Sequence, residues 1–129
     1  MSKRKGLRVY VAAKWEDRER AREVMNAFRE AGDTITYDWT VDESSFSAKQ
    51  AAADRQGVLD ADIFVGVFEK ELAYMGALVE MGMAAAHGIP IFIMGHGIDK
   101  CIFTLLPEVE RISGYEQLCN KGQRRAKAV

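Results

Sequence analysis

Cysteine and proline are both scarce in this sequence, with two of each among 129 residues. Two cysteines without a CxxC spacing form neither a disulfide framework nor a metal-binding motif, and such sparse use of cysteine fits a reducing cytosol. Long apolar runs are also missing, because none approaches the roughly 20 residues that a membrane-spanning helix needs. We therefore expect a cytoplasmic protein that does not enter a membrane.

An excess of charge of one sign is absent as well. The chain has 18 lysines and arginines against 19 aspartates and glutamates, a formal net charge of −1. This balance gives no electrostatic reason for binding a nucleic-acid polymer or an anionic membrane surface. Hydrophobic residues make up 48% of the chain, and its length suits one sizeable core. We expect a single domain over residues 1–129, with 1–6 and 124–129 frayed.

Several well-known motifs are missing too. No GxGxxG follows the first predicted strand and no GxxxxGK[ST] occurs, which argues against dinucleotide-binding and P-loop proteins. No group of histidines and cysteines has the spacing of metal ligands, and no Ser-His-Asp arrangement is visible. We expect neither a metal nor a cofactor.

Short apolar runs alternate with helical patterns along the chain. Such runs, rich in β-branched and aromatic residues, are typical of strands buried on both faces of a parallel sheet. The predicted strands are 7–13, 34–40, 63–68 and 89–94, and the predicted helices are 17–31, 48–59 and 76–88. Weaker signals predict a helical turn at 101–105, an edge strand at 109–112 and a helix at 115–123. This order predicts an α/β fold, a three-layer α/β/α sandwich around a parallel five-stranded sheet of flavodoxin or Rossmann type.

Glu80 is the only acidic or basic residue, histidine aside, between Glu71 and Asp99. It falls about one turn into the helix predicted at 76–88, just past the carboxyl end of a strand, where open α/β sheets bind ligands. The alternative is a structural salt bridge to a lysine or arginine, although none lies nearby in the sequence. In apolar surroundings the pKa of this carboxyl group should rise unless hydrogen-bond donors oppose the rise. We expect Glu80 to take part in catalysis.

Asp54 and Tyr10 are the other candidates for a chemical role. Asp54 lies on the helix before the third strand, where it is either an acid of the site or an exposed surface residue. Tyr10 lies inside the first strand and belongs either to the core or to the site. Two carboxylates and a tyrosine suit glycosyl chemistry, in which one carboxylate meets an oxocarbenium-like carbon and a second acid protonates the leaving group.

The segments that follow the strands should line the ligand, because the carboxyl ends of parallel strands share one edge of the sheet. Two small residues end the first strand and allow a close approach. The two tryptophans either stack on a base or sugar or simply pack, and His96 is either a rim residue or an exposed loop histidine. The expected substrate-binding residues are Ala12, Ala13, Lys14, Trp15, Trp39, Tyr74, Gly76 and His96.

Three segments of the chain share a wider pattern. The first strand carries Tyr10 and leads into an aromatic and polar loop at 14–17. Asp54 stands eight residues before the end of an Ala-Asp pair that opens an apolar strand. A G-x-x-x-E-x-G-x-A-x-x-x-G pattern follows, with Glu80 as its glutamate and a proline-containing strand after it. Together, over residues 7–118, they resemble the nucleoside 2-deoxyribosyltransferase family and its sister group, the 2'-deoxynucleoside 5'-monophosphate N-hydrolases.

This resemblance implies a role for each candidate. Glu80 matches the nucleophile that attacks the anomeric carbon or stabilises its charge. Asp54 matches the acid associated with protonating the leaving base, and Tyr10 matches a tyrosine at the sugar site. The implied activity is cleavage or exchange of the N-glycosidic bond of a nucleoside, deoxynucleoside or nucleoside 5'-monophosphate.

The resemblance also implies a homodimer or a larger homo-oligomer. The methionines at 75, 81 and 83 either are exposed at such an interface or belong to the core. The chain departs from the pattern at two places. Transferases of the family have an aspartate six residues before the glutamate and the hydrolases have a serine, whereas this chain has Tyr74. The hydrolases also have a loop rich in glycine and arginine after the first strand, which residues 13–17 do not match. A substrate phosphate would then have to be bound by Lys14, Arg18 or the backbone amides at a helix start.

Two other functions remain open at this point. An enzyme that cleaves the nicotinamide–ribose bond of NAD, as TIR-type domains do, would also use a glutamate on a small flavodoxin-like fold. A non-catalytic nucleotide-sensing module would explain the unusual Tyr74. The sequence leaves open the preferred base, the need for a 5'-phosphate and the choice between hydrolysis and transfer.

Overall fold

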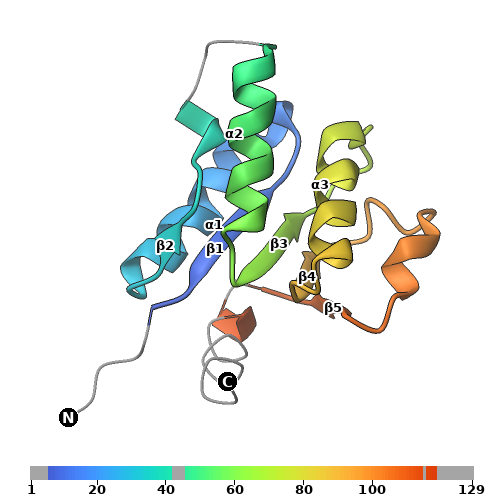
Figure 1. Cartoon of the computed structure of the whole chain (residues 1–129). Coiled ribbons are helices and arrows are strands. Elements are labelled where there is room, and N and C mark those ends of the chain that lie inside the picture. The colour runs from blue at the N-terminus through green and yellow to red at the C-terminus, as the bar shows by residue number, and fades with distance from the viewer. Residues whose placement is uncertain (1–5, 42–45, 115, 119–129) are drawn as a thin grey trace.

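A five-stranded parallel sheet forms the centre of the protein (Figure 1). The computed structural model describes residues 6–41, 46–114 and 116–118. The strand order is β2-β1-β3-β4-β5, and every neighbouring pair is parallel. The strands are β1 (Arg8–Ala12), β2 (Thr34–Ile35), β3 (Ile63–Val67), β4 (Ile91–Met94) and β5 (Val109–Ile112). This architecture confirms the predicted α/β fold. From β1 the chain adds β2 on one side and then β3, β4 and β5 on the other, so the order of the strands in the sheet switches between β1 and β3.

Helices cover both faces of the sheet. They are α1 (Arg18–Glu30), α2 (Ala48–Leu59) and α3 (Met75–Ala86). In Figure 1, α2 and α3 stand side by side in front of the sheet, and α1 lies behind it. Helix α1 turns one apolar stripe, which includes Val24 and Phe28, onto the sheet. The side chain of Tyr10 points toward the layer formed by α2 and α3, where it contacts Gly57 and Glu80. The residues of β1 that alternate with Tyr10 point toward α1.

The second strand is much shorter than the sequence predicts. A strand was expected over 34–40, but β2 ends at Ile35 and a 3₁₀ turn, η2, occupies Trp39–Val41. Asp38 causes the change, because its Oδ1 accepts a hydrogen bond of 2.9 Å from the backbone N–H of Thr40 and so favours a turn. The expected loop at 14–17 likewise contains a short 3₁₀ turn, η1 (Trp15–Asp17).

The structure confirms the helical turn and the edge strand that weaker sequence signals predicted near the end of the chain. The helical turn is a 3₁₀ segment, η3 (Ile102–Leu105), and β5 pairs with β4 at the sheet edge. Of the helix expected at 115–123, residues 116–118 are helical and the rest lies outside the described residues, as do both expected frayed ends apart from Gly6. No helix in the described part of the chain is long and apolar enough to cross a membrane.

Candidate active site

The Tyr10 side chain, from β1, packs between β3 and α2. Its side chain is buried, and its ring stacks on that of Phe64 with 5.9 Å between ring centroids. On the other side the ring lies against Gly57 of α2, where an added Cβ would come within 3.0 Å of the Tyr10 ring. Because Gly57 has no side chain, α2 can approach β1 closely enough to hold the ring in place.

Glu80 meets this tyrosine from α3. The Tyr10 hydroxyl donates a hydrogen bond of 2.6 Å to Glu80 Oε2. The length is that of a charge-assisted hydrogen bond from a hydroxyl group to a carboxylate. Tyr10 is thus a core residue that also contacts Glu80. Among the residues that the structure describes, the partner of Glu80 is this hydroxyl group and not a lysine or arginine.

The surroundings of Glu80 hold its proton unusually tightly. Burial raises the pKa of Glu80 to about 7, the hydrogen bond from Tyr10 lowers it, and the negative charge of Asp54 raises it. The pKa of Tyr10 lies well above its usual value, first because of burial and then because of the charge of Glu80. Tyr10 therefore remains a proton donor at physiological pH, whereas Glu80 gains or loses its proton near neutrality.

Asp54 completes a group of three acidic side chains. It lies on α2, half-buried, and α2 packs against α3. Its charge acts on the pKa of both Tyr10 and Glu80, which places it close to the pair. Helix α2 is fixed at its start by the Ser47 hydroxyl, which accepts a hydrogen bond of 3.2 Å from the backbone N–H of Gln50. The structure thus brings together the three residues that were singled out for chemistry.

Two of the expected substrate-binding residues, Trp39 and Tyr74, are buried and make hydrogen bonds within the protein. Trp39 is buried, and its indole N–H donates a hydrogen bond of 2.7 Å to the carbonyl oxygen of Val11. Tyr74 is buried at the start of α3, where its hydroxyl donates to the carbonyl oxygen of Lys70 at 2.7 Å and its ring packs edge-on against Phe68.

The other expected residues lie along the carboxyl edge of the sheet. Ala12 ends β1 and Ala13 follows it, and Gly76 in the first turn of α3 has open space where a side chain would be. Lys14 Nζ lies 3.5 Å from Glu16. His96 is exposed.

His96 Nδ1 lies 2.8 Å from Asp99 Oδ2, so the imidazole is held by its own loop. Trp15 is 40% exposed, and the guanidinium group of Arg18 lies 4.5 Å from the centroid of its ring.

Sequence reasoning missed the contacts that tie the loop after β3 to the start of α1. Lys70 Nζ lies 3.0 Å from Oδ1 of the buried Asp17. Arg20 makes two hydrogen bonds to Glu69, of 2.8 and 3.1 Å. Each pair spans about fifty residues of chain, so no local pattern indicates it. The described residues contain no group of three or more histidine, cysteine, aspartate or glutamate side chains that could hold a metal ion.

No family model matches this sequence, and no curated protein matches it either. Solved structures do. A conserved protein from Enterococcus faecalis V583 superposes with a TM-score of 0.63 and 18% identity, over 94% of this chain and 99% of that one. A 2-deoxyribosyltransferase from the psychrotolerant bacterium Bacillus psychrosaccharolyticus superposes with a TM-score of 0.63 and 16% identity, over 88% of this chain and 90% of that one.

This chain has the fold of a 2-deoxyribosyltransferase. The resemblance found in the sequence motifs is confirmed at the level of the fold, since the match covers nearly all of both chains. In the 2-deoxyribosyltransferase fold of this chain, the strand order reverses between β1 and β3, where parallel α/β sheets open a crevice for ligands. Tyr10 stands on one of these two strands, and Glu80 stands on the helix that follows the other.

Proposed function

We propose that the protein cleaves or exchanges the N-glycosidic bond of a nucleoside, deoxynucleoside or nucleoside 5'-monophosphate. The observation that carries the proposal is the partly buried hydrogen bond of 2.6 Å between Tyr10 and Glu80, with the charge of Asp54 close to both. A carboxyl group whose pKa is raised to about 7 by burial, with a second carboxylate close to it, is typical of a functional site. The known function of a protein with the same fold, a 2-deoxyribosyltransferase, supports the proposal independently.

In the proposed reaction Glu80 is the nucleophile. The C–N bond between the sugar and the base breaks, and its electron pair moves onto the base. In the substrate complex Glu80 is ionised and the proton of the carboxyl pair lies on Asp54, which gives it to that base. The Glu80 carboxylate meets the oxocarbenium-like carbon and forms a glycosyl ester.

The second half of the reaction reverses these roles. Water, in hydrolysis, or a second base, in transfer, gives a proton to Asp54 and attacks the anomeric carbon, and the ester bond to Glu80 breaks. Tyr10 positions the carboxylate throughout, because its hydroxyl holds one oxygen of Glu80 and leaves the other for the sugar. The positive charge that develops on the sugar also favours the ionised form of Glu80 when it is needed.

One incubation tests this proposal. The protein is mixed with deoxynucleosides, their monophosphates, ribonucleotides and NAD, with and without an added acceptor base, and the products are separated by chromatography. We expect wild-type protein to release a free base and Glu80→Gln to release at least about 1000-fold less, because an amide is a poor nucleophile. Glu71→Gln is the matched control, since Glu71 is an exposed glutamate only nine residues earlier.

Each possible result decides something. Base release that needs an acceptor identifies a transferase, and release in water alone identifies a hydrolase. Nicotinamide release from NAD would support the second enzyme class instead. If every compound survives, or if Glu80→Gln is as active as the wild type, the proposed mechanism is wrong, and a binding screen on the same pool would test the sensing hypothesis.

We further propose that the protein acts as a homodimer or a larger homo-oligomer. Met75 is 80% exposed and Val79 is 60% exposed, and both lie on the helix that carries Glu80. Of the two other methionines considered for an interface or for the core, Met81 is buried in the core and Met83 is half-buried. An apolar helix face next to the site supports association at that face. Light scattering should give at least twice the monomer mass, with Val79→Arg shifting it toward 14.4 kDa.

A further inference from the structure

A groove lies on the side of the sheet opposite to the Tyr10–Glu80 pair. It has a volume of about 680 Å³ and is open to solvent. Its lining residues are Trp15, Arg18, Glu19, Arg22, Thr40 and Val41. They come from α1, from η1 before it and from η2, whereas Glu80 and Asp54 belong to the helices on the other face (Figure 1). We call this feature the α1 groove.

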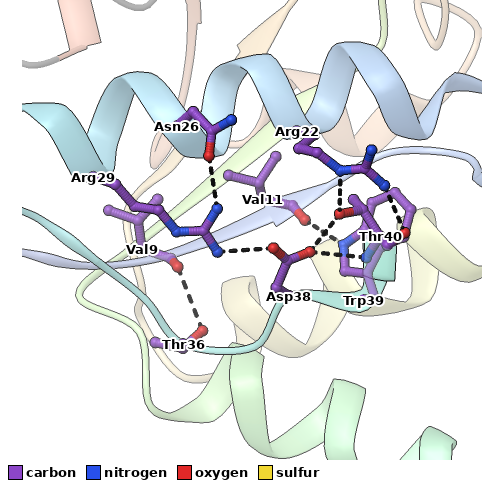
Figure 2. A network of polar contacts seen from close by, with 9 residues as sticks. All are labelled: Val9, Val11, Arg22, Asn26, Arg29, Thr36, Asp38, Trp39 and Thr40. Atoms are coloured by element: carbon purple, nitrogen blue, oxygen red, sulfur yellow. Dashed lines mark hydrogen bonds and ion pairs between the residues drawn. The ribbon is translucent and has the colours of Figure 1, made fainter. Parts of the chain in front are cut away.

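One wall of the α1 groove is held rigidly. Arg22 donates hydrogen bonds from Nε to Thr40 Oγ1 (3.2 Å) and from Nη2 to the carbonyl oxygen of Thr40 (2.9 Å). Thr40 is itself bound through its backbone N–H and hydroxyl to Asp38, which pairs with Arg29. Figure 2 shows the third nitrogen of Arg22 pointing away from Thr40. The guanidinium group is therefore positioned in advance, with donors left for a ligand.

A second arginine stands one helical turn earlier. Arg18 lies over the ring of Trp15 and donates a hydrogen bond of 3.2 Å to the carbonyl oxygen of that residue. Arg18 and Arg22 are four residues apart on α1, so their side chains share one face of the helix. Like charges at this spacing repel one another, and an anion between them would remove the repulsion.

Arg18 and Arg22 differ from the other arginines of α1 in the partners that they bind. Arg20 pairs with Glu69 at 2.8 Å and Arg29 pairs with Asp38 at 2.8 Å. Within the part of the chain that the structure describes, Arg18 and Arg22 bond only to neutral oxygens. Glu19 is the one acidic residue among the groove's lining residues, which leaves the lining with a net charge of +1.

We propose that the α1 groove binds the phosphate monoester of a small organic molecule, and that it does so independently of the Tyr10–Glu80 pair. Guanidinium groups bind phosphate oxygens through pairs of parallel hydrogen bonds, and two of them together match a doubly charged oxyanion. The exposed part of Trp15 and Val41, which is 65% exposed, provide apolar surface for the organic group. The site does not depend on the glycosidic activity proposed above.

Calorimetric titration tests the α1 groove. The probes are inorganic phosphate and ribose 5-phosphate, with ribose as the probe that lacks phosphate. Wild-type protein should bind both phosphates and not ribose. Arg18→Gln and Arg22→Gln should each weaken phosphate binding by about tenfold or more, because each removes charge-assisted hydrogen bonds. Arg8→Gln is the matched control, since Arg8 is an exposed arginine in an ion pair with Asp62 of 3.7 Å.

One comparison of folding and one further variant keep the test decisive. Arg22 also supports Thr40, so a weakened Arg22→Gln variant is compared by circular dichroism with Arg18→Gln, which breaks one hydrogen bond to its own turn. Glu80→Gln should bind phosphate within about twofold of the wild type, since the two sites lie on opposite faces of the sheet. The proposal is overturned if wild-type protein does not bind phosphate, if both arginine variants bind it normally, or if Glu80→Gln loses binding.

Discussion

At the scale of single residues, burial and one hydrogen bond act on Glu80 in opposite directions. Burial holds the proton on the carboxyl group, and the Tyr10 hydroxyl stabilises its ionised form, with a resulting pKa of about 7. The sequence indicated Glu80 through the absence of other charges around it, but it could not indicate this partner. Tyr10 lies 70 residues away, and only the pairing of β1 with β3 and the packing of α3 bring the two together.

Replacing Tyr10 with phenylalanine isolates that hydrogen bond. Without the hydroxyl, burial acts unopposed and the pKa of Glu80 should rise further. We expect turnover at neutral pH to fall by about 10- to 100-fold, with the acid side of the pH–rate profile moving to higher pH. Tyr74→Phe is the control. It also removes a tyrosine hydroxyl, but that hydroxyl donates to a backbone oxygen, so the apparent pKa of Glu80 should not change. An unmoved profile in Tyr10→Phe would contradict the role of the hydroxyl.

Replacing Asp54 with asparagine should move the same pKa the other way. The charge of Asp54 raises the pKa of Glu80, so its removal lowers that pKa toward the ordinary value. Turnover should nevertheless fall, by about 100-fold or more, because the leaving base loses its proton donor. A substrate with a leaving group that needs no protonation should recover most of the lost rate. Equal losses for both kinds of substrate would exclude Asp54 as the general acid.

At the scale of elements, the sequence predicted β1, β3 and β4 because their residues are buried on both faces and form continuous apolar runs. It overestimated β2, because alternating β-formers over 34–40 do not reveal that Asp38 binds the backbone of Thr40. The burial of Trp39 depends on the same turn, which directs its indole toward the carbonyl oxygen of Val11. The place of Gly57 against the Tyr10 ring also depends on packing that no local pattern encodes.

Two Gly→Ala variants in neighbouring helices should have opposite effects. At Gly82 in α3 an added Cβ meets nothing within 4 Å, so alanine should stabilise the protein by roughly 0.5–1 kcal/mol. At Gly57 in α2 the Cβ would lie 2.8 Å from the Tyr37 Cβ and 3.0 Å from the Tyr10 ring. Alanine there should cost roughly 1–3 kcal/mol in the free energy of unfolding and lower turnover by displacing Tyr10. Urea denaturation measures both, and stabilisation by Gly57→Ala would contradict this packing.

At the scale of the whole molecule, a parallel sheet with three short crossover helices follows from the order of the elements and the right-handedness of crossovers. The sequence could not show how much the candidate site lowers the free energy of unfolding. That effect comes from the ionisation of Glu80. A carboxyl group that ionises at about pH 7 when folded and near 4.5 when unfolded binds its proton more tightly in the folded state.

The sign of the pH effect follows directly. Because the folded state holds the Glu80 proton more tightly, this residue makes the free energy of unfolding decrease as the pH rises from about 4.5 through about 7. Above pH 7 the penalty is complete, and a shift of this size corresponds to roughly 3 kcal/mol. Glu80→Gln carries no charge at any pH, so it should be more stable than the wild type at pH 8, with little difference at pH 4.5.

Urea denaturation of both proteins at a series of pH values measures this difference, and Glu71→Gln controls for the loss of an exposed glutamate. If the free energies of unfolding of wild type and Glu80→Gln change with pH in the same way, ionisation of the Glu80 carboxyl group does not destabilise the folded state. A gap that opens between pH 4.5 and 7 would instead mean that the fold tolerates an unfavourable charge at this position. A gain in stability together with a loss of turnover in one variant would then tie that charge to the reaction.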